Sequence, residues 1–471
     1  MRPLEKLMPK VAGPTLKSWA DIRENVARRR KRRARSDWSY FAAVDEIYHA
    51  RWAARQLARF DTVRRAVRHF WPDGYPVSLI QVAGTSGKGS TCHFIQAGLS
   101  MHLKAGCYVK PHVFDYAERF VVQNRTVSHD EVAEVWEEKV KPYCIQGAVK
   151  GEPWTLGQPE ASILIALHVF AAHELDWAAV ETGLGGRFDP VTALDVKATV
   201  LTNVGKDHEE VLGSEPWQRA LEKSGICRPG VPLFTSARDP VTLEVLRAVS
   251  KDVGAKVVEV DEGDYERMKG AAARVGAVPG SECLLSSEHQ LWNAALAARV
   301  VASLVRAPDP ATLAKAFSKT RFVGRFWRVE EGVYADVAHN PSKTEALADE
   351  IRAKFPHTKK VFVVGISGER DPVALTAPLV PQALALVVTS AGYKGQDPSQ
   401  VFRRLKSAFP SLEVRLERDP RATLALAKGL SASGEPVIFT GSTYMVDQAL
   451  NKDARLRHLN GTYGWREAAE R

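Results

Sequence analysis

The sequence is poor in cysteine. Its 471 residues include five cysteines, Cys92, Cys107, Cys144, Cys227 and Cys283, which lie far apart and form no C-x-x-C pair. An odd number of scattered cysteines is not typical of a disulfide framework or of a zinc site, so we expect reduced thiols and no zinc.

Long apolar runs are also missing. The longest apolar stretches, 163–169 and 294–305, contain His168 and Arg299 and fall short of the about 20 apolar residues that a membrane-spanning helix needs. The first ten residues, MRPLEKLMPK, lack the apolar core and the small-residue cleavage site of a secretory signal. We therefore predict a cytoplasmic protein with no transmembrane segment and no membrane partner.

The positive charge is concentrated near the start of the chain. The formal net charge is +10, and residues 28–35 (RRRKRRAR) contribute seven basic side chains, which leaves about +3 for everything else. Such a block attracts polyanions, so a nucleic-acid contact stays open as an alternative. No aromatic residue is interleaved with the arginines, so we favour a solvated, highly charged helix and expect no nucleic-acid partner.

Strands alternate with helices over most of the chain. After a helical segment at 41–70, apolar strands are expected at 77–82, 178–181, 198–204 and 231–235, and later at 333–337, 361–364, 385–389 and 437–440. This alternation predicts an α/β fold with a mostly parallel sheet, followed by a smaller α/β domain. We predict a basic extension at 1–40, a first domain at 41–322 and a second at 323–471, joined by a hinge near Gly324.

A glycine-rich loop follows the first predicted strand and precedes a predicted helix at 91–103. Small residues there let backbone N–H groups approach a phosphate at the helix N-terminus. Lys88 would reach the β- and γ-phosphates and Ser90 would offer its hydroxyl to Mg²⁺. The alternative is a purely structural turn. The candidate nucleotide-binding residues of the loop are Gly84, Thr85, Ser86, Gly87, Lys88, Gly89 and Ser90.

Polar residues also follow two later strands. Glu181 stands at the end of the strand at 178–181, and Asp207 and His208 follow the strand at 198–204. Ligands bind at the carboxyl ends of strands in open α/β sheets, and Mg²⁺ prefers oxygen ligands. We therefore interpret Glu181 and His208 as candidate metal ligands, although each alone could be a structural residue at a strand end.

Eight motifs occur in the order expected of one family. They are GTSGKGS at 84–90, PHVFDYAER at 111–119, ETGLGGRFD at 181–189, GKDH at 205–208, EKSGI at 222–226, HQLWNAALA at 289–297, GRF at 324–326 and DVAHNP at 336–341. With these motifs the chain resembles the folylpolyglutamate synthase/dihydrofolate synthase family of the Mur ligase superfamily. The resemblance implies a Mur-ligase-like ATPase domain followed by a Rossmann-like domain. It also implies a ligase that uses ATP and Mg²⁺ to join L-glutamate to a folate-type carboxylate through an acyl phosphate, and we expect a monomer.

The resemblance also implies roles for individual residues. It makes Lys88, Lys223, Arg325 and His339 catalytic, and Asn293, Arg325 and Asp336 nucleotide contacts. The metal ligands that the resemblance implies are Ser90, Glu181, His208 and Lys223. Lys223 matches a lysine that is carbamylated in much of the superfamily. Ser442 and Tyr444 resemble a loop that lines the glutamate site.

The sequence departs from the family pattern mainly on the acceptor side. Lys110-Pro111-His112 stands where the family has Ser-Pro-His, and Pro190-Val191-Thr192 replaces Ala-Thr-Asn. Lys110 could pair with an anionic acceptor. Two alternatives therefore remain: a Mur-type ligase for a non-folate carboxylate, and a non-catalytic nucleotide-binding module whose basic arm contacts nucleic acid. Simple nucleotide binding would not need Lys223, Arg325 and His339 together, which favours the ligase.

Overall fold

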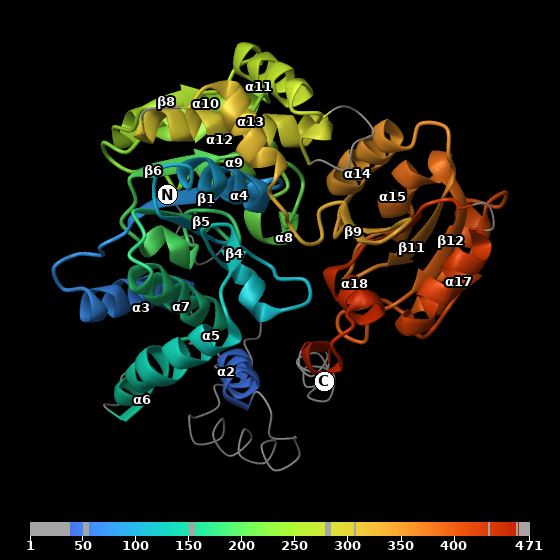
Figure 1. Cartoon of the computed structure of the whole chain (residues 1–471), viewed down its shortest axis with the longest axis horizontal. Helices are drawn as coiled ribbons and strands as arrows, with labels where there is room; N and C mark the ends of the chain where they lie inside the picture. Colours follow the sequence, from blue (N-terminus) through green and yellow to red (C-terminus); the bar gives the residue numbers. More distant parts are fainter. Residues whose placement is uncertain are drawn as a thin grey trace. The chain divides into compact units, whose positions relative to one another are not determined.

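The structure is a computed structural model that describes residues 38–49, 56–149, 156–277, 284–305, 308–431, 434–457 and 460. The basic run at 28–35 and Cys283 lie outside these residues. The chain divides into two compact units (Figure 1). Unit 1 comprises Met1–Pro111, Ala117–Met268 and Trp292–Phe317, and unit 2 comprises His112–Tyr116, Lys269–Leu291 and Ser318–Arg471. No helix among the described residues is long and apolar enough to cross a membrane.

Unit 1 is built on an eight-stranded sheet. In spatial order its strands are β4 (Arg125–Thr126), β3 (Phe120–Val122), β2 (Ala105–Tyr108), β5 (Trp177–Glu181), β1 (Ser78–Ala83), β6 (Ala198–Leu201), β7 (Leu233–Thr235) and β8 (Val257–Glu259). Six neighbouring strands are parallel to one another, namely β2, β5, β1, β6, β7 and β8. At one edge of the sheet, β3 is antiparallel to β2, and β4 is antiparallel to β3. The predicted mostly parallel sheet is therefore confirmed.

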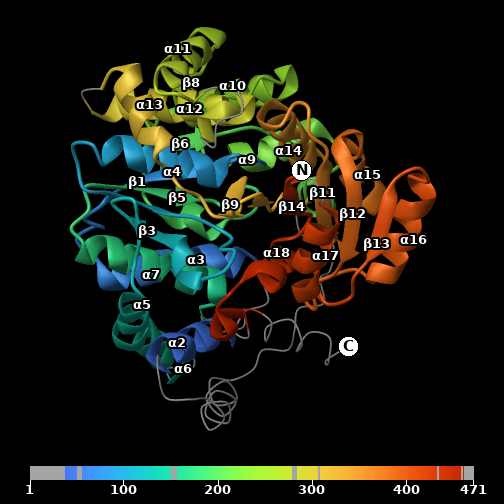
Figure 2. The same ribbon diagram turned by 45° about the vertical axis from the view of Figure 1, so that its right-hand side comes forward.

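Helices cover both faces of this sheet. α4 lies on one face and α7 on the other, as the two views agree (Figures 1 and 2). Strands buried on both faces need nearly continuous apolar sequence, and β1, β5 and β6 are almost fully buried. The helical elements from residue 38 to 318 are α2 (Trp38–His49), α3 (Gln56–Phe70), α4 (Lys88–Leu99), η2 (Tyr116–Arg119), α5 (His129–Val135), the π-helix η3 (Trp136–Val140), α6 (Lys141–Val149), α7 (Gln158–Ala172), η4 (Pro190–Ala193), α8 (Glu209–Leu212), α9 (Pro216–Ser224), α10 (Pro240–Val253), α11 (Glu262–Arg274), η5 (Leu284–Ser286), α12 (Glu288–Leu304) and α13 (Pro310–Ser318).

The predicted helical segment at 41–70 corresponds to α2 and α3, and α2 already begins at Trp38. The hydroxyl of Tyr40 accepts the backbone N–H of Ala117 at 3.1 Å. Farther along α2, the buried carboxylate of Glu46 accepts the indole N–H of Trp136 at 2.9 Å. These buried polar contacts help to anchor α2 within unit 1, because hydrogen bonds between buried groups are costly to break.

Unit 2 contains a six-stranded sheet. Its strands in spatial order are β13 (Glu413–Leu416), β12 (Ala383–Thr389), β11 (Lys360–Gly365), β14 (Val437–Thr440), β10 (Val333–Ala335) and β9 (Trp327–Glu330). β9 is antiparallel to β10, and the other neighbours are parallel. Its helical elements are α14 (Pro341–Lys354), α15 (Pro372–Thr376), η6 (Ala377–Gln382), α16 (Pro398–Ala408), η7 (Pro420–Ala422), α17 (Thr423–Leu430) and α18 (Thr443–Leu450). The expected second α/β domain is thus present.

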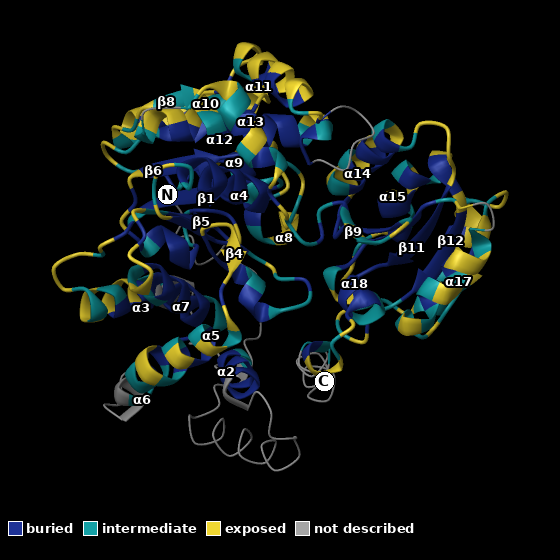
Figure 3. Ribbon diagram, viewed as in Figure 1, coloured by how far each residue is buried: buried dark blue, intermediate teal, exposed yellow. Residues whose placement is uncertain are grey.

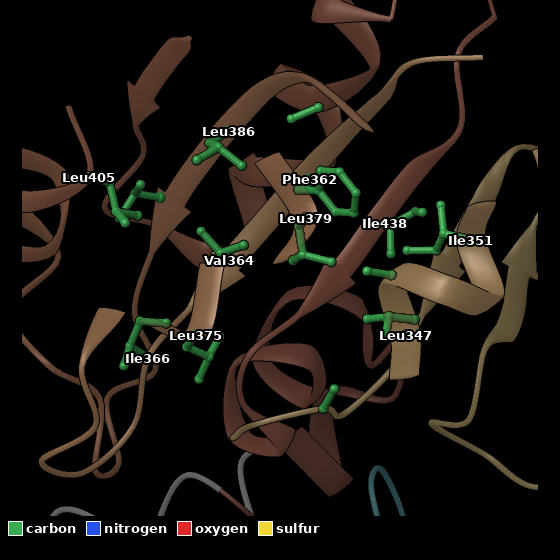
Figure 4. Packing of buried hydrophobic residues seen from close by; sticks show 14 of the residues in the cluster. Leu347, Ile351, Phe362, Val364, Ile366, Leu375, Leu379, Leu386, Leu405 and Ile438 are labelled. Atoms are coloured by element: carbon green, nitrogen blue, oxygen red, sulfur yellow. The ribbon is translucent and has the colours of Figure 1, made fainter. Parts of the chain in front are cut away.

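Alternating residues of the second sheet build two cores. Phe362 and Val364 of β11 pack with Leu405 of α16 on one face (Figure 4). Val361 and Val363 belong to the cluster on the opposite face, which includes residues of α17 and α18. Successive side chains of a strand point to opposite faces, so an unbroken apolar strand fills both cores. The central strands of both units are accordingly coloured as buried in Figure 3.

Candidate functional site

The glycine-rich loop connects the end of β1 directly to α4. Gly87 has φ +80° and forms the N-cap of α4, and the N–H of Thr91 donates to its carbonyl at 2.8 Å. A glycine adopts this left-handed backbone at little cost, so the helix can begin immediately after it. α4 therefore starts at Lys88 and ends at Leu99, whereas the sequence predicted 91–103. The shift places Lys88 and Ser90 in the first helical turn, where backbone N–H groups have no helical acceptor.

Asn293 of α12 packs against this loop. A Cβ atom added to Gly87 would lie 2.8 Å from the Cγ of Asn293, and Asn293 is buried. A larger residue at position 87 would therefore displace the amide. The structure thus brings together two predicted nucleotide-binding residues that are far apart in sequence.

The ammonium of Lys88 folds back over the loop. It donates to the carbonyls of Gly84 at 3.1 Å and of Thr85 at 3.4 Å, and it lies 4.0 Å from Oε1 of Glu181. Glu181 ends β5, which pairs in parallel with β1 so that Glu181 is opposite Val82. The register of these central strands therefore places the candidate metal ligand beside the phosphate loop, as the sequence predicted.

Lys223 approaches the same loop from α9. Its side chain is buried, and its ammonium donates to the Gly84 carbonyl at 3.2 Å. Two ammonium groups, those of Lys88 and Lys223, thus converge on one carbonyl oxygen. Such a concentration of positive charge suits a polyanionic ligand such as a nucleotide phosphate.

The segment after β6 holds the loop in shape. The side chain of Asn203 accepts the N–H of Ser86 at 3.0 Å, and the hydroxyl of Thr202 donates to the Ser86 carbonyl at 2.6 Å. Thr85 in turn accepts the N–H of Gly205 at 2.9 Å. These contacts explain why β6 ends at Leu201 rather than at the predicted residue 204. The sequence analysis missed Asn203, although its position after a central strand was a usable signal.

Among the candidate metal ligands, His208 is the most exposed to solvent. It has φ +51° at the N-cap of α8, and 44% of its side chain is exposed. Its ring nitrogens lie 3.8 Å from Asp207 and 3.4 Å from Glu210.

The described part of the chain contains no group of three or more His, Cys, Asp or Glu that could hold a metal. The buried Ser90 hydroxyl and Glu181 carboxylate are hard oxygen donors of the type that Mg²⁺ takes together with phosphates and water.

Two buried thiols lie within the electrostatic reach of the site. Burial raises the pKa of Cys92 and Cys107, and the negative charge of Glu181 raises both further. Lys88 and Lys110 act in the opposite direction on the pKa of Cys92. Glu181, Lys88 and Lys110 are therefore all close enough to Cys92 for their charges to change the pKa of its thiol.

In unit 2, Asp336 organises the turn that carries Arg325. Its carboxylate accepts the N–H of Phe326 at 2.9 Å and of Ala338 at 2.8 Å. Burial raises the pKa of Asp336, and the positive charge of Arg325 opposes this shift. Phe326 has φ +38°, a region that costs a non-glycine residue energy. The Asp336 contact holds this strained turn, so the structure brings the predicted pair Arg325 and Asp336 together.

His339 lies in the segment between Asp336 and α14. Its Nδ1 is 2.8 Å from the carbonyl of Val337, and its Nε2 is 3.0 Å from the ammonium of Lys343. A carbonyl only accepts, so Nδ1 carries the hydrogen and Nε2 accepts from Lys343. The ring is therefore neutral in this arrangement, with an ammonium beside it.

The structure reveals a buried carboxyl that the sequence analysis missed. Glu350 of α14 lies 3.8 Å from Lys354 and 3.7 Å from His289. Burial raises the pKa of Glu350 to about 8; the charge of Lys354 lowers it and that of Asp336 raises it. Burial also lowers the pKa of His289 to about 4, and Arg325 lowers it further. The two candidate nucleotide contacts, Arg325 and Asp336, therefore adjoin a tightly coupled ionic cluster.

Ser442 and Tyr444 lie at the carboxyl edge of the second sheet. Ser442 caps α18, and its hydroxyl is hydrogen-bonded to that of Ser367. Tyr444 is 38% exposed, and its ring meets that of Tyr393 edge to face at 4.7 Å. The role of Ser442 and Tyr444 in glutamate binding stays a prediction.

The fold and the loop define a class, that of Mur-ligase-like α/β proteins. Residues 324–443 match the model of the Mur ligase, glutamate ligase domain. Among solved structures, the Mycobacterium tuberculosis folylpolyglutamate synthase complexed with ADP matches with a TM-score of 0.74 and 23% identity, over 88% of this chain and 98% of that chain. A Yersinia pestis bifunctional folylpolyglutamate synthase/dihydrofolate synthase complexed with AMPPNP and Mn matches with a TM-score of 0.66 and 24% identity, over 82% and 92%. These matches confirm the predicted fold class.

Curated proteins that this chain resembles are named as folylpolyglutamate synthases. A probable bifunctional folylpolyglutamate synthase/dihydropteroate synthase of Haloferax volcanii is 28% identical, over 83% of this chain and 48% of the relative. The chain thus spans about half the length of that relative. The dihydrofolate synthase/folylpolyglutamate synthase of Haemophilus influenzae is 27% identical, over 78% of this chain and 87% of the relative. The predicted resemblance to the folylpolyglutamate synthase/dihydrofolate synthase family of the Mur ligase superfamily is confirmed.

Proposed function

We propose that this chain is an ATP- and Mg²⁺-dependent ligase that joins L-glutamate to a folate-type carboxylate through an acyl phosphate. The convergence of Lys88, Lys223 and Glu181 around Gly84 carries the proposal. It is supported by the glutamate ligase domain at 324–443 and by similar proteins solved with ADP or with AMPPNP and Mn.

The residues of unit 1 would bind the triphosphate and the metal. The free N–H groups at the start of α4 would bind a phosphate, and Lys88 and Lys223 would offset its charge. Bound Mg²⁺ would neutralise phosphate oxygens, with Ser90, Glu181 and His208 as its proposed protein ligands. Phosphoryl transfer depends chiefly on positioning and charge neutralisation, which is what these side chains can supply.

Lys223 is a proposed site of carbamylation. A free ammonium beside Mg²⁺ would be repelled, whereas addition of CO₂ would turn it into an anion with oxygen donors. In the present contacts the Lys223 amine donates to a carbonyl, so the alternative is that it remains an ordinary ammonium. A carbamate would add a mass of CO₂ to this residue.

Arg325, Asp336 and His339 are proposed to bind the nucleotide. They are held together by the carboxylate contacts of Asp336 and by the short segment leading to α14. Arg325 and Lys343, whose ammonium donates to His339, place positive charge there, which suits phosphate oxygens. The monomeric state and the cytoplasmic location stay predictions.

An ADP-release assay tests the function. Purified protein with ATP, Mg²⁺ and L-glutamate should release ADP only when a pteroate or folate acceptor is added, with equal formation of the glutamylated product. A nucleotide-binding module would show no acceptor-dependent release. Turnover with another carboxylate but with no pteroate would leave the ligase chemistry standing and support the Mur-type alternative.

A further inference from the structure

Lys110 lies at the carboxyl edge of the first sheet, two residues after β2. Its backbone N–H donates to Oε2 of Glu181 at 2.9 Å. Its ammonium lies 3.0 Å from the point that a Cβ on Gly183 would occupy. Gly183 thus leaves the space that the lysine takes, and because Gly183 is exposed and Lys110 is only half-buried, a ligand can reach this ammonium.

Within the described part of the chain, the ammonium of Lys110 makes no direct ion pair. Among the described residues this ammonium has no carboxylate within ion-pair distance and no hydrogen-bond acceptor. It lies 5.4 Å from the centre of the Tyr108 ring. The nearby carboxylate of Asp189 is already occupied, because it accepts the N–H groups of Gly183 at 2.8 Å and of Leu184 at 3.1 Å. In the ranges that the structure describes, the Lys110 ammonium therefore forms no direct ion pair, and it can accept an anionic ligand.

The ammonium groups of Lys88 and Lys110 lie at different places around Glu181. That of Lys88 lies 4.0 Å from Oε1 and over the glycine-rich loop, whereas Lys110 contacts Oε2 through its backbone N–H and extends its ammonium toward Gly183. If Lys88 offsets phosphate charge as proposed, Lys110 is left for an anion on the acceptor side. An ammonium paired with the reacting carboxylate would reduce its nucleophilicity, so a non-reacting anionic group is the better match.

Resting on the proposed function, we propose that Lys110 binds a second, non-reacting carboxylate of the acceptor. This residue would make the chain prefer an acceptor that already ends in an amino acid over one with a single carboxylate. A site built around a charged group discriminates strongly against an analogue that lacks the matching group, because its own charge is then left unpaired.

The test compares two acceptors that differ by one amino acid. Dihydrofolate ends in glutamate and carries two carboxylates, and dihydropteroate carries one. Rates of ADP release would be measured for the wild type, Lys110→Met, Lys110→Arg and the control Lys197→Met, with KM determined for each acceptor and for ATP. Lys197 is an exposed lysine of the same unit that immediately precedes β6, at the opposite edge of the sheet.

Lys110→Met should raise the KM for dihydrofolate roughly tenfold or more, as expected for loss of a charged hydrogen bond. Its KM values for dihydropteroate and for ATP should change less than about twofold, Lys110→Arg should retain most of the preference, and Lys197→Met should match the wild type. Thermal unfolding checks that each variant is folded.

An equal increase in KM for both acceptors in Lys110→Met, or a higher KM for ATP, would overturn the role of Lys110. An unchanged KM for dihydrofolate in Lys110→Met would also overturn it. Turnover by the wild type would still support the ligase function in either case. If the wild type used neither acceptor, the proposed function itself would fall, and the assignment of Lys110 with it.

Discussion

Replacement of Lys88 by Ala removes an ammonium that the loop holds where we expect the γ-phosphate. In the structure its Nζ lies 4.0 Å from a carboxylate oxygen of Glu181, and we take this as the distance between the ammonium and an opposite charge in the site. Two unit charges about 4 Å apart interact by about 4 kcal/mol at an effective dielectric constant of about 20. If that interaction is made with phosphate oxygens in the transition state, its loss slows turnover on the order of 10³-fold.

The fold should tolerate this change. The Gly84 carbonyl that loses the Lys88 donor keeps the one from Lys223 at 3.2 Å, so we expect only a small shift in the unfolding temperature. The assay is single-turnover ADP formation at saturating ATP and Mg²⁺, with Lys104→Ala as the control. Lys104 is paired with Glu174 on the surface, where both side chains are at least half exposed. Turnover by Lys88→Ala close to that of Lys104→Ala would refute the assignment of the loop.

Three further predictions follow from the same geometry. Glu181→Gln should slow turnover and raise the Mg²⁺ concentration needed for half-maximal rate, and an unchanged Mg²⁺ titration would remove Glu181 from the metal site. Lys223→Ala should lose activity and regain part of it with added short carboxylates, whereas absence of rescue together with no CO₂ mass on Lys223 would support the ordinary ammonium. Glu350 has a folded pKa of about 8 against an ordinary value of 4.5, so the folded state binds more protons between these values and stability falls as pH rises through that window. From pH 7.5 to 8.5, His289 is almost entirely neutral both in the folded state, where its pKa is about 4, and in the unfolded state, where the ordinary value is 6.5. In this range the unfolding free energy of the wild type should therefore fall more steeply with pH than that of Glu350→Gln. Chemical denaturation would measure this difference, with the exposed Glu345→Gln on the same helix as control; parallel profiles of the wild type and Glu350→Gln would contradict it.

Local pattern was enough to predict the class of fold and the place of the glycine-rich loop between a strand and a helix. Apolar strands alternating with helical segments mark a parallel sheet, because strands buried on both faces need continuous apolar sequence. The strand Val437–Thr440 has the predicted bounds, and the loop at 84–90 has its strand and helix on either side. Element ends were less predictable, because they depend on single contacts such as the Gly87 cap of α4.

Which side chains meet was decided by tertiary structure alone. The strand order β2-β5-β1-β6 is not the chain order, so it brings Glu181 beside the loop after β1, and α9 adds Lys223 from 139 residues beyond Gly84. The same packing leaves Lys110 without an ion-pair partner among the described residues and buries Glu350, which raises the pKa of that carboxyl. Periodicity in a sequence reports which face of an element is buried, whereas charge pairing and desolvation depend on neighbours that only the packed chain supplies.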